Sequence, residues 1–162
     1  MDKAMSTQLY DVLDVVGRRF QEVFSQLFGG GTAQIVLTDP DNILTGGIDF
    51  YIQPPGKKRQ QLTLLSGGER ALTVIALLFS FLDYRPAPFC VLDEVDAALD
   101  EANVERFSSY LNRINKETQF IVVSHRKKTM EAAEVLQGVT MVERGVSRLL
   151  TVAFEDVKED LA

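Results

Sequence analysis

The sequence has few of the residues that hold disulfide-linked domains and zinc sites together. Among its 162 residues are one cysteine, Cys90, one histidine, His125, and no tryptophan. A single cysteine excludes an intramolecular disulfide, and one cysteine with one histidine are too few ligands for a tetrahedral zinc site. Cys90 lies within an apolar run, where we expect a buried, unreactive thiol. This cysteine usage favours a reducing, cytoplasmic location.

Long apolar runs and an excess of positive charge are also missing. The longest apolar stretch, residues 71–82, contains Thr73 and Ser80 and is shorter than the roughly 20 residues that cross a bilayer. The N-terminal residues lack a signal-peptide pattern, so we expect no membrane partner. The 17 basic and 23 acidic residues sum to −6, which argues against a surface that binds nucleic acid throughout. The basic cluster at residues 57–59 is typical of a solvated loop, and an anion-facing role is the less common alternative.

The periodicities predict one α/β domain with a sizeable core. Apolar residues at spacings of three and four predict a helix over residues 6–28, which the glycines at 29–31 end. This helix suits either the end of a coiled coil or an amphipathic helix packed on its own domain. A strand, helix and strand with short connections, over residues 89–123, predict a parallel βαβ unit. The further expected elements are strands 33–38 and 48–52, a buried helix 69–82, a helix 126–136, a hairpin of strands 139–142 and 147–154, and an acidic tail 155–162.

Two motifs precede and follow the helix expected to be buried. Ser66-Gly67-Gly68-Glu69 stands at its start, where glycines allow a close backbone approach and free N–H groups favour an anion. The alternative is an ordinary helix cap. The second motif places Asp93 and Glu94 at the carboxyl end of a strand, where α/β sheets bind ligands. Asp93 is then suited to Mg²⁺, directly or through water, and Glu94 to a general base; the alternative is a pair of solvated carboxylates.

Two further polar residues follow these motifs. Asp100 ends the segment Ala98-Leu99-Asp100 and has the alternative role of capping the next helix. His125 follows Ser124 at the end of the next strand. A lone histidine is more often structural than catalytic, but we expect this strand to lie beside the one that ends in Asp93, which favours a functional role.

In this order and spacing, the four motifs resemble the C-terminal half of an ABC-type ATPase. Residues 66–69 resemble its signature motif, residues 89–94 its Walker B motif with the adjoining catalytic glutamate, residues 98–100 its D-loop, and His125 its switch histidine. In the residues of these motifs and of several neighbouring segments, the chain resembles the SMC (structural maintenance of chromosomes) family, and its bacterial chromosome-condensation members most closely. That resemblance covers residues 20–154 and is carried by residues 28–31, 37–40, 53–58, 64–72 and 91–100.

The resemblance implies an α/β fold, the C-terminal half of a P-loop NTPase head, preceded by the end of a coiled coil. A phosphate-binding loop needs Gly-x-x-x-x-Gly-Lys-Ser/Thr, and residues 56–58 lack both the earlier glycine and the hydroxyl. In SMC proteins the phosphate loop lies in a separate N-terminal lobe, so the lack of this loop in residues 56–58 agrees with the resemblance. The implied organisation is a coiled-coil end at 1–28, a C-terminal head lobe at 29–154 and a tail at 155–162.

The resemblance also implies an activity and its partners. Two SMC heads enclose two ATP molecules, with Ser66, Gly67, Gly68 and Glu69 meeting the nucleotide of the opposite head. Asp93 with Mg²⁺, Glu94 and His125 serve the nucleotide of their own head, and the chain without its N-terminal lobe is expected to be inactive. The implied partners are the N-terminal lobe, a second head, DNA and the winged helix of a kleisin subunit near residues 139–154, in a nucleoid-associated, cytoplasmic protein.

Two other functions fit the same motifs. One is a head lobe of a different ABC-type enzyme, such as a DNA-repair ATPase or, less well given the coiled-coil-like start, a transporter subunit. The other is a docking module that is derived from a head and has no activity. Restored ATP turnover on adding an N-terminal lobe separates the split enzymes from the docking module.

Overall fold

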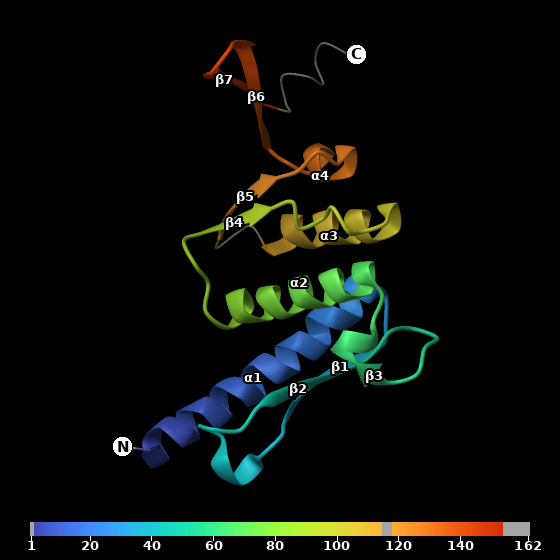
Figure 1. Ribbon diagram of the computed structural model, residues 1–162, viewed down its shortest axis with the longest axis vertical. Helices are drawn as coiled ribbons and strands as arrows, with labels where there is room; N and C mark the ends of the chain where they lie inside the picture. Colours follow the sequence, from blue (N-terminus) through green and yellow to red (C-terminus); the bar gives the residue numbers. More distant parts are fainter. Residues whose placement is uncertain (1, 115–117, 154–162) are drawn as a thin grey trace.

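The computed structural model describes residues 2–114 and 118–153, and the side chains of all of these except 2, 3, 41, 152 and 153. Its elements stack along the long axis of the molecule, from the N-terminal helix at one end to a hairpin at the other (Figure 1). In chain order these are α1 (Asp2–Phe28), β1 (Thr32–Leu37), η1 (Pro40–Asn42), β2 (Ile48–Gln53), β3 (Gln60–Gln61), η2 (Leu62–Leu64), α2 (Gly67–Tyr84), β4 (Phe89–Asp93), α3 (Glu101–Ile114), β5 (Gln119–Val123), α4 (Lys127–Glu131), β6 (Val135–Glu143) and β7 (Val146–Ala153). No helix within the described residues is long and apolar enough to cross a membrane.

Helix α1 is firmly attached to the rest of the molecule at its C-terminal end. It ends at Phe28 and is followed by three glycines, residues 29–31, with positive φ angles of 71°, 132° and 85°. A Cβ at Gly31 would lie 2.4 Å from the carbonyl oxygen of Gln53, so only glycine fits there. The Gln21 amide donates to the Gly31 carbonyl at 3.2 Å and accepts from the Ala33 N–H at 2.8 Å. Arg106 of α3 donates to the carbonyl of Phe28 at 3.1 Å.

A single core joins the three long helices. Apolar residues on α1 recur every three or four positions, as do those on α2 and α3, so each helix presents one buried stripe. Phe79 of α2 stacks on Phe107 and Tyr110 of α3, with ring centroids 6.1 and 5.1 Å apart. The largest fully buried side chains are Phe20, Phe24, Leu27, Ile52, Leu72, Phe79, Leu99, Val104 and Phe107.

The expected parallel βαβ unit is confirmed. β4 and β5 pair in parallel, with Phe89 opposite Gln119 and Asp93 opposite Val123, and α3 connects them. The expectation that α2 is buried is wrong for one of its faces, and one face of the two strands is exposed as well. Phe89 and Val91 are 59% and 56% exposed, and Val74 of α2 is also exposed. The two-stranded sheet has apolar residues on both faces, while the core lies on one face only.

Beyond β5 the structure departs from the sequence prediction. The helix expected over 126–136 is short, α4 ends at Glu131, and β6 begins at Val135. Residues 135–140 pair in antiparallel register with 148–153, and these ladder bonds replace the second half of the expected helix. The hairpin itself is confirmed, but its first strand is longer than predicted. The acidic tail at 155–162 lies outside the described residues.

Candidate nucleotide site

The glycine-rich turn before α2 is a fully formed capping box. Ser66 is the N-cap, and its Oγ accepts from the Glu69 N–H at 3.4 Å, while Glu69 Oε2 accepts from the Ser66 N–H at 3.2 Å. The Ser66 hydroxyl also donates to Glu69 Oε2 at 2.7 Å. The helix-cap alternative is therefore true of Ser66, and it fixes the orientation of the first turn. The hydroxyl proton points to Glu69, so it must rotate before it can bond a phosphate.

Lys57 of the basic cluster extends this arrangement. Its Nζ lies 2.9 Å from Glu69 Oε1, and this bond is the largest of the effects that hold the pKa of Glu69 below its ordinary value. Arg59 lies over the ring of Tyr51, 4.7 Å from the centroid, and Lys58 is exposed. The sequence alone gave no role to Lys57, because its contact with Glu69 depends on the path of the loop after β2.

The two glycines of the turn have different surroundings. A Cβ on Gly67 would meet nothing within 4 Å, whereas a Cβ on Gly68 would lie 2.9 Å from the carbonyl oxygen of Ala98. Gly68 thus allows the first turn of α2 to approach the segment that contains Asp100. Gly67 leaves open space at the start of an 18-residue helix, where backbone N–H groups and the helix dipole favour an anion.

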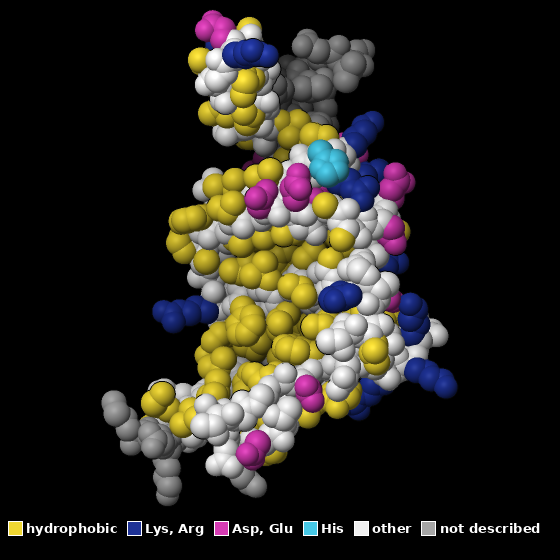
Figure 2. Space-filling model, viewed as in Figure 1, with side chains coloured by type: hydrophobic (Ala, Val, Ile, Leu, Met, Phe, Trp, Pro, Cys, Tyr) yellow, Lys and Arg dark blue, Asp and Glu magenta, His cyan; other side chains and the backbone are white. Residues whose placement is uncertain are grey.

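The acidic motif lies at the end of β4, beside the histidine at the end of β5. Glu94 has a left-handed φ of 48°, and its N–H donates to the Val123 carbonyl at 2.9 Å. Glu94 Oε1 lies 3.9 Å from His125 Nδ1, and both side chains are largely exposed. Figure 2 shows the chain's histidine next to acidic side chains, above a broad apolar area. The structure therefore brings Asp93, Glu94 and His125 to one sheet edge.

Asp100 serves as a helix cap. Its Oδ1 accepts from the Asn103 N–H at 2.8 Å at the start of α3, and its side chain is exposed. The cap leaves the other carboxylate oxygen available for a contact outside this chain. This segment lies next to the glycine-rich turn through the approach of Gly68 to Ala98.

These residues fit a magnesium nucleotide only in part. Mg²⁺ is usually held by one or two carboxylates together with substrate phosphates, and Asp93 supplies one exposed carboxylate at the expected strand end. Within the part of the chain that the structure describes, no three metal-ligating side chains gather. The residues present are compatible with a Mg²⁺ ion whose other ligands come from a nucleotide or from another lobe.

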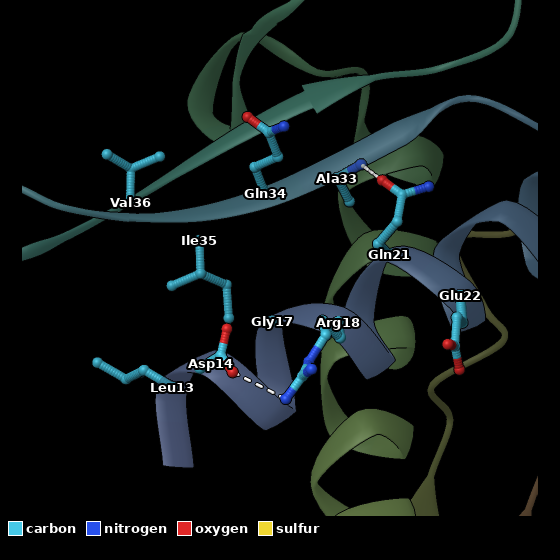
Figure 3. Close-up of a pocket in the computed structure, with 10 residues that line it drawn as sticks. All are labelled: Leu13, Asp14, Gly17, Arg18, Gln21, Glu22, Ala33, Gln34, Ile35 and Val36. Carbon is cyan, nitrogen blue, oxygen red and sulfur yellow. Dashed lines mark hydrogen bonds and ion pairs between the residues drawn. The ribbon is translucent and has the colours of Figure 1, made fainter. Parts of the chain in front are cut away.

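A separate hollow lies between α1 and β1 (Figure 3). Two of its polar side chains pair with each other, since Arg18 lies 2.8 Å from Asp14, and Gln21 accepts from the backbone N–H of Ala33. None of the predicted site residues lines it. It therefore adds nothing to the candidate nucleotide site.

Two polar residues near the site, Asp96 and the partly buried Arg126, were not predicted from the sequence. Asp96 is fully buried, and its Oδ2 accepts from the hydroxyls of Ser124, at 2.6 Å, and Thr129. Arg126 donates to the carbonyls of Ala97, at 3.4 Å, and Leu99. Both residues stand within or beside the quoted motifs, but their contacts depend on how β4 and β5 pair.

The parallel βαβ unit, with its flanking helices and motifs at the strand ends, defines an α/β fold of the SMC ATPase head type. Residues 15–148 match the family described as "RecF/RecN/SMC N terminal domain". The chain belongs to this family. It is 58% identical over 159 residues to the "Chromosome partition protein Smc" of Bacillus subtilis, which covers 98% of this chain and 13% of that protein.

Solved SMC heads share the fold over nearly the whole chain. A Pyrococcus furiosus Smc head domain, with an extended coiled coil and bound to the C-terminal domain of ScpA, superposes with a TM-score of 0.89 and 35% identity. That match covers 98% of this chain and 40% of the other. A structure reported under "ATP-driven dimerization and DNA stimulated activation of SMC ATPases" gives a TM-score of 0.86 and 35% identity, over 96% of this chain and 94% of that one.

Proposed function

We propose that this chain is the C-terminal lobe of an SMC ATPase head. In this proposal residues 1–28 are the end of a coiled coil, residues 29–154 form the lobe, and residues 155–162 are a tail. The observation that carries it is the exposed apolar face of the β4–β5 sheet and α2. An uncovered apolar patch of this kind marks an interaction site, and a separate N-terminal lobe that holds the phosphate loop is the occupant we propose.

The exposed side chains of this face follow the pleat of the sheet. Phe89 and Val91 are alternate residues of β4, and Ile121 and Val123 are alternate residues of β5, with Ile121 opposite Val91; all four are about half exposed. Alternate residues of a strand share one face, so these four form a continuous apolar surface. Figure 2 shows apolar side chains across the middle of the molecule, at the level of α2 and the sheet.

The proposed chemistry divides the motifs between two nucleotides. Glu94 acts as the general base for an attacking water, and His125, 3.9 Å from it, assists on the same nucleotide. Asp93 holds Mg²⁺, directly or through water; when bound, this ion neutralises phosphate charge. Ser66, Gly67 and Gly68 meet the γ-phosphate bound to a second head, with Glu69 fixing the turn and Asp100 facing the opposite subunit. Positioning and charge neutralisation account for most catalysis of this kind.

The proposed assembly includes a kleisin subunit and DNA, and its role is chromosome condensation and segregation. Its support is the name of the relatives, "Chromosome partition protein Smc", and a head solved with the "C-winged helix domain of ScpA". In this chain the hairpin β6–β7 is the candidate docking surface. Val139 and Leu149 face each other in register and are 70% and 67% exposed, and Leu150 is exposed on the other face.

Reconstitution tests the proposal. ATP hydrolysis is measured for the chain alone, for a separately expressed N-terminal lobe of the same protein, and for the two mixed. We expect turnover only in the mixture, and we expect Glu94→Gln to remove it. Substantial turnover by the chain alone would contradict the split head. A mixture that forms a complex but hydrolyses no ATP would support the docking module instead.

A further inference from the structure

Asp96 is an acidic side chain in a fully buried position. Its side chain has no solvent exposure, and Oδ2 accepts two hydrogen bonds, from the hydroxyls of Ser124 and Thr129. Among the described residues, Oδ1 has no hydrogen-bond partner. A buried carboxylate in this state is costly, and replacing such groups by apolar ones is often neutral or stabilising. Stability alone is therefore a poor account of Asp96.

The bonds of Asp96 lead directly to His125. Ser124 Oγ donates to Asp96 and accepts from the Arg126 N–H at 3.0 Å, so one hydroxyl bonds on both sides. His125 is the residue between these two anchored positions. Its backbone is thus held by the carboxylate through Ser124, and its ring is placed relative to Glu94 by that backbone.

A second link joins the same two segments, and its donor again belongs to the segment after β5. The Arg126 guanidinium donates to the carbonyls of Ala97 and Leu99 in the segment that ends at Asp100. Its buried Nε has no partner among the described residues. We name this pair of links, made by Asp96, Ser124, Thr129 and Arg126, the 96–126 clasp. It ties the segment after β4 to the segment after β5 at two points.

We infer that Asp96 and Arg126 are positioning residues that make the loop of Asp100 and the turn of His125 move as one body. This inference rests on the proposed function, in which Asp100 faces the opposite head and His125 its own nucleotide. The clasp then couples engagement of the second head to placement of His125 beside Glu94. Two separate links between the loops resist independent motion, because donors after β5 hold a side chain and the backbone carbonyls of the segment after β4 at different points.

The chain offers a direct probe that is independent of ATPase activity. His125 is the only histidine, so its imidazole gives one Hε1 resonance in the NMR spectrum of the purified chain. Ser124→Ala removes the hydroxyl bridge and is expected to shift this resonance. Asp96→Asn keeps an acceptor oxygen at the Oδ2 position and is expected to leave it close to wild type. Ser80→Ala is the control, because Ser80 is fully buried and its hydroxyl likewise donates a 2.6 Å hydrogen bond, to the Ala76 carbonyl, away from the clasp.

The same variants are then measured in the full-length protein. Ser124→Ala is expected to lower kcat by about 10- to 100-fold with little change in KM, since a small misplacement of a catalytic group can cost that much. Arg126→Met, on the other link, is expected to lower kcat. It is also expected to shorten the lifetime of the ATP-dependent head dimer, which is measured with Glu94→Gln added to slow hydrolysis. Ser80→Ala is expected to change neither quantity.

The outcomes separate the clasp from the proposed function. If the histidine resonance is the same in Ser124→Ala and Ser80→Ala, the clasp does not position His125, whatever the ATPase result. A loss of kcat in Asp96→Asn equal to that in Ser124→Ala would also overturn the inference, because the hydrogen bonds are retained and only the charge is lost. Full-length wild-type protein without ATPase activity would instead contradict the proposed function.

Discussion

Gly67 and Gly68 are adjacent in the sequence, yet the structure gives alanine at these positions opposite effects on stability. At Gly67 a Cβ meets no atom within 4 Å, and φ is not left-handed. Gly67→Ala is expected to raise the free energy of unfolding by about 0.4–1 kcal/mol, because the unfolded chain loses conformational freedom. At Gly68 a Cβ would lie 2.9 Å from the Ala98 carbonyl oxygen. The resulting overpacking costs roughly 1–3 kcal/mol, which exceeds the same entropic gain.

The two alanine variants are expected to differ in stability but to share a loss of ATP-dependent dimerisation. The space beside Gly67 is where we propose that the γ-phosphate of a second head approaches, so the new methyl group obstructs it. Gly67→Ala is therefore expected to be more stable than wild type and unable to dimerise with ATP. Gly68→Ala is expected to lose both stability and dimerisation, because it pushes the turn away from the segment of Asp100.

Two measurements decide the outcome. Urea unfolding of the chain reports stability, and size-exclusion chromatography of the reconstituted head with ATP reports dimerisation. Normal dimerisation by Gly67→Ala would refute a phosphate-facing Gly67. Equal stability of the two variants would refute the packing of Gly68 against Ala98.

Three further expectations can be tested with the same preparations. Glu94→Gln is expected to slow hydrolysis by about 10²–10⁴-fold and to prolong the ATP dimer seen by chromatography; an unchanged dimer lifetime would argue against Glu94 as the base. The bond from Lys57 lowers the pKa of Glu69 from 4.5, so its stabilisation is present above pH 4.5 and is lost as the pH falls through the lowered pKa. Lys57→Met is therefore expected to lose less stability than wild type in urea unfolding below pH 4.5, and parallel acid profiles would contradict this. Met141→Asp, on the exposed hairpin, is expected to weaken kleisin pull-down while ATP turnover persists, and undiminished pull-down of the folded variant would count against this docking surface.

The parts of the fold that depend on local sequence were predictable. The βαβ unit follows from alternating strand and helix patterns with short connections, and both strands lie within one residue of their predicted bounds. The helix expected over 126–136 was wrong in its second half, because residues from Val135 pair with a strand that comes later in the chain. Periodicity alone does not report such a partner.

The exposure of residues and their side-chain contacts were not predictable from pattern. A strand with an apolar run such as β4 has the same sequence pattern whether one face of its sheet or both faces are buried. The exposure of Phe89 and Val91 is therefore known only from the structure. The spacing of the motifs indicated that Glu94 and His125 lie at one sheet edge, which the register of β4 and β5 brings about. The burial of Asp96 and the contact of Lys57 with Glu69 need the folded loops.

The attachment of α1 to the head has a mechanical consequence. The three glycines after α1 would form a loose swivel if nothing else held the helix. Gln21 and Arg106 bridge that joint on two sides, to the first residues of β1 and to α3. A rotation of α1 or a force along it is therefore transmitted to β1 and α3. Because α3 begins beside Asp100, a force on α1 that reaches α3 also reaches the loop that we propose faces the second head. The joint therefore transmits force and does not bend freely.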